Sequence, residues 1–76
     1  MKRMYIKWRD HYVRSGWTDP SNILEDNNGL IIESVGFLVK ENKHCYVISC
    51  AVDENGMASD PFTILKSTVV SKRILK

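Results

Sequence analysis

The residues of this chain best suited to binding chemistry are its lysines and arginines, which gather near its two ends, and the aromatic residues that lie among them near the N-terminus. Met1–Trp17 has five basic residues against one acidic residue, and Pro61–Lys76 has four basic residues and no acidic one. The intervening Thr18–Asp60 has eight acidic residues and two basic ones, and the net charge of the whole chain is +2. Because phosphates bind lysine and arginine and bases stack on aromatic rings, a nucleic-acid interface is one function to consider.

Strand parity selects which of these side chains share a face. Met4–Arg9 alternates between apolar and polar residues, as a half-buried strand does. Trp8 falls on the apolar face and is expected in the core, whereas Tyr5 shares the basic face; the alternative is that the basic residues only solvate and protect the strands. Pairing of the first and last strands would bring both basic segments to one side. The candidate binding residues are then Tyr5, Lys7, Arg9, Trp17, Lys72 and Arg73.

Trp17 stands between a Ser-Gly pair and a Thr-Asp-Pro segment, in a predicted loop. A single large apolar side chain in such a loop is expected to cover one end of the core. The alternative is an exposed anchor for a protein partner, because tryptophan is enriched among the residues that dominate binding energy. Covering the core is the interpretation that the sequence favours.

Metal-binding and catalytic patterns are not found in the sequence. His11, His44, Cys45 and Cys50 lack the paired spacing that zinc sites usually show. Ser34 has no glycine-flanked nucleophile motif around it, and no phosphate-binding glycine loop occurs. A chain of 76 residues fills a small β-barrel with its own side chains. We therefore predict no metal, no cofactor and no enzymatic activity.

The two cysteines are predicted to be free thiols. Cys45 and Cys50 lie on one predicted strand at an odd spacing, which places them on opposite faces and prevents a disulfide between them. We expect Cys50 in the core and Cys45 facing outward. The basic N-terminal start is not followed by an apolar region, so no signal peptide is predicted. Together these features indicate a reducing, cytoplasmic location.

Five strands with short connections are predicted, together with one longer loop at Asp10–Gly29 that contains a helical or 3-10 turn after Thr18. Asp53–Gly56 is a predicted turn with glycine where the backbone needs a positive φ, and Met57–Pro61 is a loop or a short extra strand. Inward residues are expected to include Tyr46, Ile48, Phe62 and Ile64. The predicted strands are Met4–Arg9, Leu30–Glu41, Lys43–Asp53, Phe62–Leu65 and Val69–Leu75, with a tight turn at Lys66–Thr68.

The second predicted strand, Leu30–Glu41, has apolar residues on both faces and a glycine, Gly36, inside it. A strand that bends around this glycine and serves two packed sheets explains the pattern more simply than a flat strand. Five short strands with glycine-containing turns predict a single all-β domain over residues 1–76, either a small barrel or a small sandwich. Closing a barrel would pair the first strand with the last and remove two exposed edges.

Four segments resemble short uncharacterised proteins encoded in bacteriophage and prophage genomes. They are Ile6–Asp10, Gly16–Trp17, Ser34–Val39 and Pro61–Lys66. The family often has tryptophan where Phe37 stands here and proline at the position of Leu65. The resemblance implies a phage-related origin and a five-stranded antiparallel SH3-like barrel. It implies no catalytic or binding residue.

Three functions follow as hypotheses. The favoured one is a non-catalytic binding or accessory protein that contacts a protein partner, a host protein among the candidates, through the loops Asp10–Gly29 and Asp53–Pro61. The first alternative is a nucleic-acid-binding barrel that uses a basic face. The second alternative is a homo-oligomeric structural component, because small barrels with free edges often associate. No membrane partner is expected, since no apolar run approaches the roughly 20 residues that a membrane helix needs.

Overall fold

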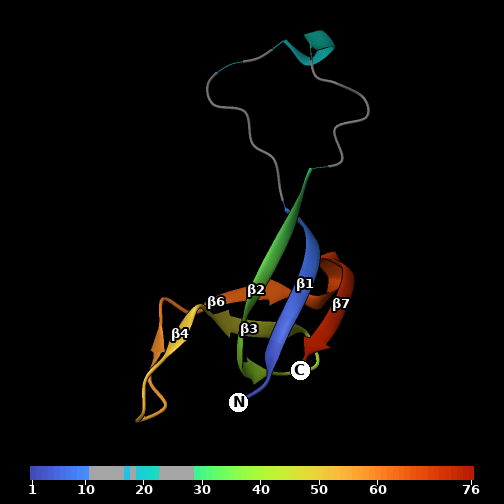
Figure 1. Cartoon of the computed structure of the whole chain (residues 1–76). Helices are drawn as coiled ribbons and strands as arrows, with labels where there is room; N and C mark the ends of the chain where they lie inside the picture. Colours follow the sequence, from blue (N-terminus) through green and yellow to red (C-terminus); the bar gives the residue numbers. More distant parts are fainter. Residues whose placement is uncertain (11–16, 18, 23–28) are drawn as a thin grey trace.

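The computed structural model describes residues 1–10, 17, 19–22 and 29–76, and this part of the chain is a small all-β fold. Three predicted strands, Leu30–Glu41, Phe62–Leu65 and Val69–Leu75, occur with the bounds that the sequence indicated. The elements in chain order are β1 (Arg3–Asp10), η1 (Pro20–Asn22), β2 (Leu30–Glu41), β3 (Cys45–Ser49), β4 (Ala51–Val52), β5 (Ala58–Ser59), β6 (Phe62–Leu65), η2 (Lys66–Thr68) and β7 (Val69–Leu75) (Figure 1).

Five strands form one antiparallel sheet in the order β6-β3-β2-β1-β7, and β4 and β5 form a separate hairpin. The predicted pairing of the first and last strands is confirmed, with Arg3 opposite Leu75. Both termini therefore lie at the same end of the molecule (Figure 1). The sheet is open, however, because its two edge strands, β6 and β7, do not pair with each other among the described residues. The short 3-10 turn η2 connects these two strands.

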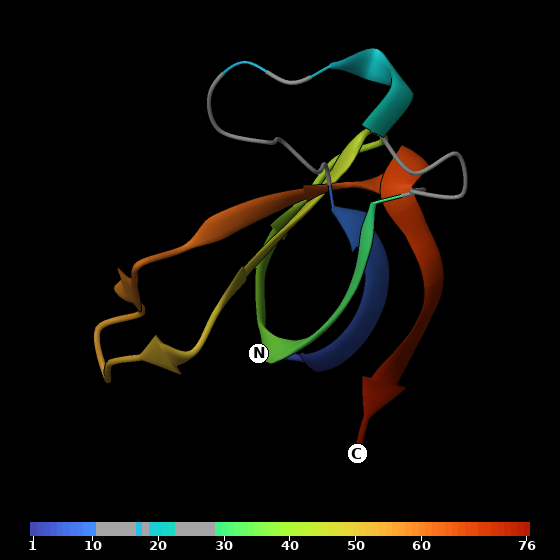
Figure 2. The ribbon, with the colours of Figure 1, turned by 90° about the horizontal axis from the view of Figure 1, so that it is seen from above.

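β2 is shared between the two halves of the sheet. Its residues Leu30–Phe37 pair with β1, and Phe37–Glu41 pair with β3. Gly36 stands next to this change of partner, where a Cβ atom would lie 2.8 Å from the carbonyl oxygen of Ser49. Absence of a side chain lets the backbones approach, and the sheet curves over its own inner face (Figure 2). The expected bend at Gly36 agrees with this pairing, but the expectation of two packed sheets is wrong, because both partners of β2 belong to one five-stranded sheet.

Replacing Gly36 with alanine should lower the free energy of unfolding by about 1–3 kcal/mol, because the added methyl group meets a backbone carbonyl that cannot rotate away. Chemical denaturation followed by circular dichroism measures the loss. Ser71→Ala on β7 is the control, since Ser71 is exposed and its replacement should change stability by no more than about 0.5 kcal/mol. Equal stability of the two variants would contradict close approach at Gly36.

The core lies between the two halves of the curved sheet. β1 supplies Met4 and Ile6, β3 supplies Tyr46 and Ile48, and β6 supplies Ile64. Each of these side chains is at most 3% exposed. Trp8 packs against this cluster from β1, and its Nε1 donates a hydrogen bond to Ser34 Oγ at 3.0 Å. Trp8 therefore lies on the core side of β1, as predicted, although it is only partly buried, and the remaining partly buried residues against the cluster are Leu38 and Val69.

The structure corrects the prediction for Cys50. β3 ends at Ser49 and the chain bends at Cys50, which breaks the alternation on which the prediction depended. Cys50 is exposed, while Ser49, expected outward, is 1% exposed. The Ser49 hydroxyl lies in hydrogen-bonding contact with the carbonyl oxygens of Ala51, at 2.8 Å, and Ser59. The two cysteines are free, as expected, with Cys45 half-buried.

Phe62 is likewise not in the core. It is the first residue of the edge strand β6 and is 42% exposed, whereas Ile64 further along the strand is buried as predicted.

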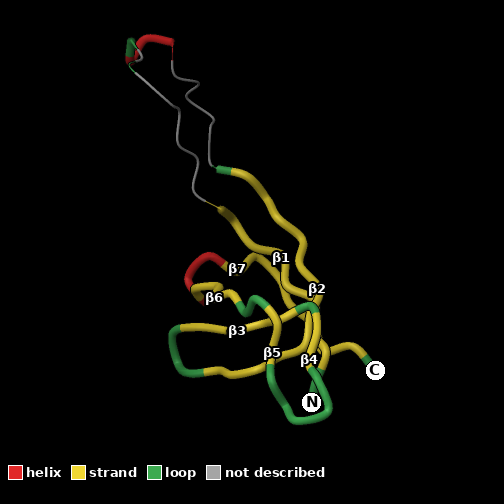
Figure 3. Tube along the Cα trace, turned by 90° about the vertical axis from the view of Figure 1, so that its left-hand side faces the viewer, coloured by secondary structure: helices red, strands yellow, loops and turns green. Residues whose placement is uncertain are grey.

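The turn before β5 agrees with the sequence prediction of a positive φ at its glycine, because Gly56 has a φ of +83°. The β4–β5 hairpin continues beyond β3 and β6 and projects away from the five-stranded sheet in Figure 1, so in Figure 3 it points toward the viewer. The side-chain Oδ1 of Asp53 accepts the amides of Asn55 and Met57 and so closes this hairpin.

Candidate functional site

One face of the sheet carries four of the six residues that the sequence proposed for binding. In the antiparallel register, Tyr5 lies opposite Val35 of β2 and opposite Arg73 of β7. Residues directly opposite each other point to the same side, and alternate residues of a strand share a face. We call this surface the outer face, because it lies opposite the core. Its candidate residues are Tyr5, Lys7, Arg9 and Arg73.

Tyr5 is engaged by its neighbours on the outer face. Its hydroxyl donates a hydrogen bond to Glu33 Oε1 at 2.8 Å, and the guanidinium of Arg73 lies 5.1 Å from the centre of its ring. The hydrogen bond to Glu33 raises the pKa of Tyr5. Because the ring is half-buried and has a guanidinium beside it, Tyr5 is a poorer stacking platform for a base than the sequence suggested.

Lys72 lies on the opposite side of β7 from Arg73. It pairs with the core residue Ile6, and its Nζ donates a hydrogen bond to the hydroxyl of Tyr46. The expectation that Lys72 and Arg73 act on one side is therefore wrong, because adjacent residues of a strand alternate between its faces. Lys72 instead belongs to the inner side of the curved sheet.

Trp17 is fully exposed, with a relative accessibility of 105%, so it does not cover the core as the sequence led us to expect. Its exposure agrees with the alternative of a partner anchor, which stays a prediction. Beyond Trp17, the described part of the predicted recognition loop Asp10–Gly29 includes η1, where Asp19 Oδ1 accepts the amide of Ser21 at 3.0 Å. Most of this loop lies outside the described residues, as does His11.

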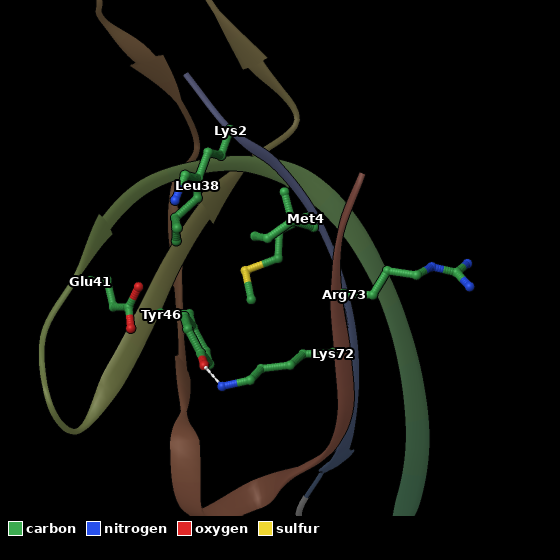
Figure 4. A pocket seen from close by; sticks show the side chains of 8 residues that line it. Lys2, Met4, Leu38, Glu41, Tyr46, Lys72 and Arg73 are labelled. Carbon is green, nitrogen blue, oxygen red and sulfur yellow. Dashed lines mark hydrogen bonds between the residues drawn. The ribbon is translucent and has the colours of Figure 1, made fainter. Parts of the chain in front are cut away.

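A pocket of about 400 Å³ lies between β1 and β7 on one side and the C-terminal end of β2 and the start of β3 on the other. Met4 and Tyr46 reach it from the core, and Figure 4 shows Lys72 and Glu41 directed toward Tyr46 while the guanidinium of Arg73 points away. Ile74, 46% exposed, adds apolar surface beside Lys72. The residues that line the pocket are Lys2, Met4, Leu38, Glu41, Tyr46, Lys72, Arg73 and Ile74.

Two lysines lie near the ring of Tyr46. Lys66 Nζ is 4.7 Å from its centre and Lys72 Nζ is 5.2 Å away, both within the range of cation–π attraction. Lys66 also forms an ion pair with Glu41 Oε2 at 2.6 Å. Its hydrogen bond holds the pKa of Glu41 below the ordinary value, and the hydrogen bond to Tyr46 raises the pKa of Lys72.

These contacts leave positive charge at the mouth of the pocket. The ammonium group of Lys66 forms an ion pair with the carboxylate of Glu41, and within the described ranges this is the only ion pair. Lys2 and Lys72 therefore have no carboxylate within ion-pair distance in that part of the chain. Cations beside the apolar surfaces of Leu38 and Ile74 suit a ligand that combines an acidic group with an apolar one.

Replacing Glu41 with glutamine should make stability less dependent on acid pH. The folded-state pKa of Glu41 is lowered, so its contribution is present above the ordinary glutamate pKa of about 4.3 and is lost as the pH falls through the folded-state pKa. The melting temperature of the variant should fall below that of the wild type at pH 7, and the two should converge at the acid end. Glu54→Gln, in an exposed turn, is the control for removing one surface carboxylate and should change the melting temperature at pH 7 less than Glu41→Gln does. An equal response of both variants would contradict the Glu41–Lys66 pairing.

Sequence reasoning did not identify Lys2, Glu41, Tyr46 or Lys66 as site residues. The available signal was the alternation of Lys72 with Ile74 in the last strand, which places a cation on an apolar face. The pocket itself depends on which residues of distant strands lie opposite each other, and local patterns do not contain that information.

Comparison of the chain with known protein families, with curated proteins and with solved structures found no match. The described residues contain no helix with the length and apolar character that crossing a membrane requires. The function is therefore inferred from the contacts and charges of the site.

Proposed function

We propose that this chain is a small non-catalytic binding protein that recognises a protein partner through the pocket between β1, β2, β3 and β7. The observation that carries this proposal is the combination of an apolar surface with the two cations Lys2 and Lys72 in a pocket of about 400 Å³. That volume lies within the range of about 300–1,000 Å³ for ligand pockets. It accommodates a few side chains of a bound peptide segment, and its charge favours an acidic one.

We propose further that the fold belongs to the SH3-like barrels and that the protein is of phage-related origin, acting in the cytoplasm of a host cell. The strand order β6-β3-β2-β1-β7 supports the first point, together with a 3-10 turn before the last strand and a long connection after the first. The resemblance of four sequence segments to phage-encoded proteins supports the second point.

Binding of an acidic, apolar peptide tests the proposed function. A blocked peptide of sequence Thr-Glu-Thr-Val-Thr-Glu-Thr, which carries glutamate and valine on one face of an extended strand, is titrated into the ¹⁵N-labelled chain. It should shift backbone amides around Leu38, Tyr46 and Ile74 more than those of the outer face. Ile74→Ser should weaken binding roughly tenfold, since it removes apolar contact from the pocket. Val35→Ser is the matched control, because Val35 is also an exposed apolar strand residue but lies on the outer face. Shifts confined to the outer face, or no shift at millimolar peptide, would reject the pocket as the binding site.

Nucleic-acid binding is the second candidate, and the shared face of Lys7, Arg9 and Arg73 favours it. Fluorescence anisotropy at low salt measures it with single-stranded DNA and RNA. If the outer face binds, Arg73→Ser should weaken binding and added salt should weaken it steeply. Lys72→Ser, on the inner side, should have the smaller effect. Absence of binding at low salt would end this proposal.

A further inference from the structure

We infer that the partner is held as an added β-strand along the free edge of β7, with its alternate side chains entering the pocket. This inference rests on the proposed function, because it names the form and chemistry of the ligand of that pocket. It requires a free strand edge, a pocket on the side of that edge, and a charge pattern that selects the partner.

The free edge is the outer side of β7. Among the described residues β7 pairs with β1 alone, on one side. Val70–Ile74 are all exposed, so no other described segment covers this strand (Figure 2). An edge strand presents unpaired N–H and C=O groups, and an extended peptide can pair with them as a further strand of the sheet.

The pocket lies on the inner side of that edge. Lys72 and Ile74 are alternate residues of β7, so they share a face, and both line the pocket. Side chains directly opposite each other on paired strands have Cβ atoms about 4.5–5.5 Å apart. An acidic side chain opposite Lys72 would therefore reach its ammonium group, and an apolar side chain opposite Ile74 would cover its exposed surface.

The charges identify the occupant as an acidic segment of another protein. Lys72 faces the pocket and Arg73 faces the outer side, so an added strand meets a cation on each of its two faces. Lys76 follows directly after β7 and adds a further positive charge. A second copy of this chain paired through β7 would instead place these cations against one another, which destabilises a strand pair.

Peptides methylated on the backbone nitrogen test strand addition. The peptide Thr-Glu-Thr-Val-Thr-Glu-Thr is compared with two versions that carry N-methyl groups on alternate residues, one version for each register. In an added strand only every second amide donates to β7. One methylated version should therefore lose about tenfold or more in affinity for the full chain, while the other should bind nearly as the unmodified peptide does. Amides of Val70–Ile74 should also gain protection from hydrogen exchange in the complex.

The outcomes separate this inference from the proposed function. If both methylated peptides bind as tightly as the unmodified one and still shift pocket amides, strand addition is overturned and pocket binding stands. Absence of any pocket shift with all three peptides overturns both. Protection of the β7 amides without peptide that rises with protein concentration would mean that a second copy occupies the edge, which also overturns the inference.

Discussion

Replacing Ile6 with alanine is expected to lower the free energy of unfolding by about 2–5 kcal/mol. Ile6 is 0% exposed and lies at the centre of a core with only five buried apolar side chains among the described residues. Few neighbours are available to fill the cavity that the shorter side chain leaves. A chain of this length has a total stability of roughly 4–11 kcal/mol at the usual value per residue, so the variant should lose much of it.

Urea denaturation followed by tryptophan fluorescence measures this loss. Ile31→Ala is the matched control, because Ile31 is also a strand isoleucine but is 43% exposed on the outer face. The control should lose no more than about 1 kcal/mol. If Ile6→Ala and Ile31→Ala were equally stable, the buried cluster between the two halves of the sheet would not be the core.

Replacing Tyr46 with alanine should cost about 3–5 kcal/mol, because Tyr46 is 3% exposed and its ring belongs to the core. The same change should abolish peptide binding, since the ring forms one wall of the pocket and interacts with Lys66 and Lys72. Loss of the fold and loss of the site are coupled at this residue, so the alanine variant alone does not separate them.

Tyr46→Phe separates the two effects. The phenylalanine ring keeps the packing and the attraction for both lysines, but it removes the hydroxyl that accepts a hydrogen bond from Lys72. This variant should retain most of the stability in thermal denaturation and most of the affinity for the acidic peptide. A phenylalanine variant as unstable as the alanine variant would contradict a mainly apolar role for the ring.

Alternation along single strands predicted much of the fold. It placed Met4, Ile6 and Trp8 on the core side of β1 and Ile64 on the core side of β6, and it located β2 and β7. The burial predictions for β1 and β6 succeeded because each of these strands has one face against the core. In such strands a period of two in the sequence reports burial directly.

The same rule failed where a strand ended or lay at an edge. It expected Cys50 inside and Ser49 outside, but β3 ends at Ser49 and the Ser49 hydroxyl contacts backbone carbonyls of both strands of the following hairpin. Phe62 lies at the start of an edge strand, where less of the protein covers it. Both errors come from tertiary neighbours that the local sequence does not contain.

The candidate site was less predictable than the fold. Clustering of basic residues near both ends was visible in the sequence, and the pairing of β1 with β7 joins the two clusters. The division of Lys72 from Arg73 follows from strand alternation, but the meeting of Lys72, Tyr46 and Glu41 needs the registers of two distant strand pairs. Register depends on turns and bulges along the whole sheet, such as the shift between Leu38 and Lys40.

Charge exchange at Lys72 tests most directly whether the pocket beside β7 selects an acidic partner. The affinity of Lys72→Glu is measured for the Thr-Glu-Thr-Val-Thr-Glu-Thr peptide and for the same peptide with lysine in place of glutamate, with Lys7→Glu on the outer face as the matched control. Lys72→Glu should lose about tenfold or more for the acidic peptide and gain affinity for the basic one, while Lys7→Glu should bind both as the wild type does. An equal effect of the two substitutions, or no effect of Lys72→Glu, would contradict recognition at this pocket.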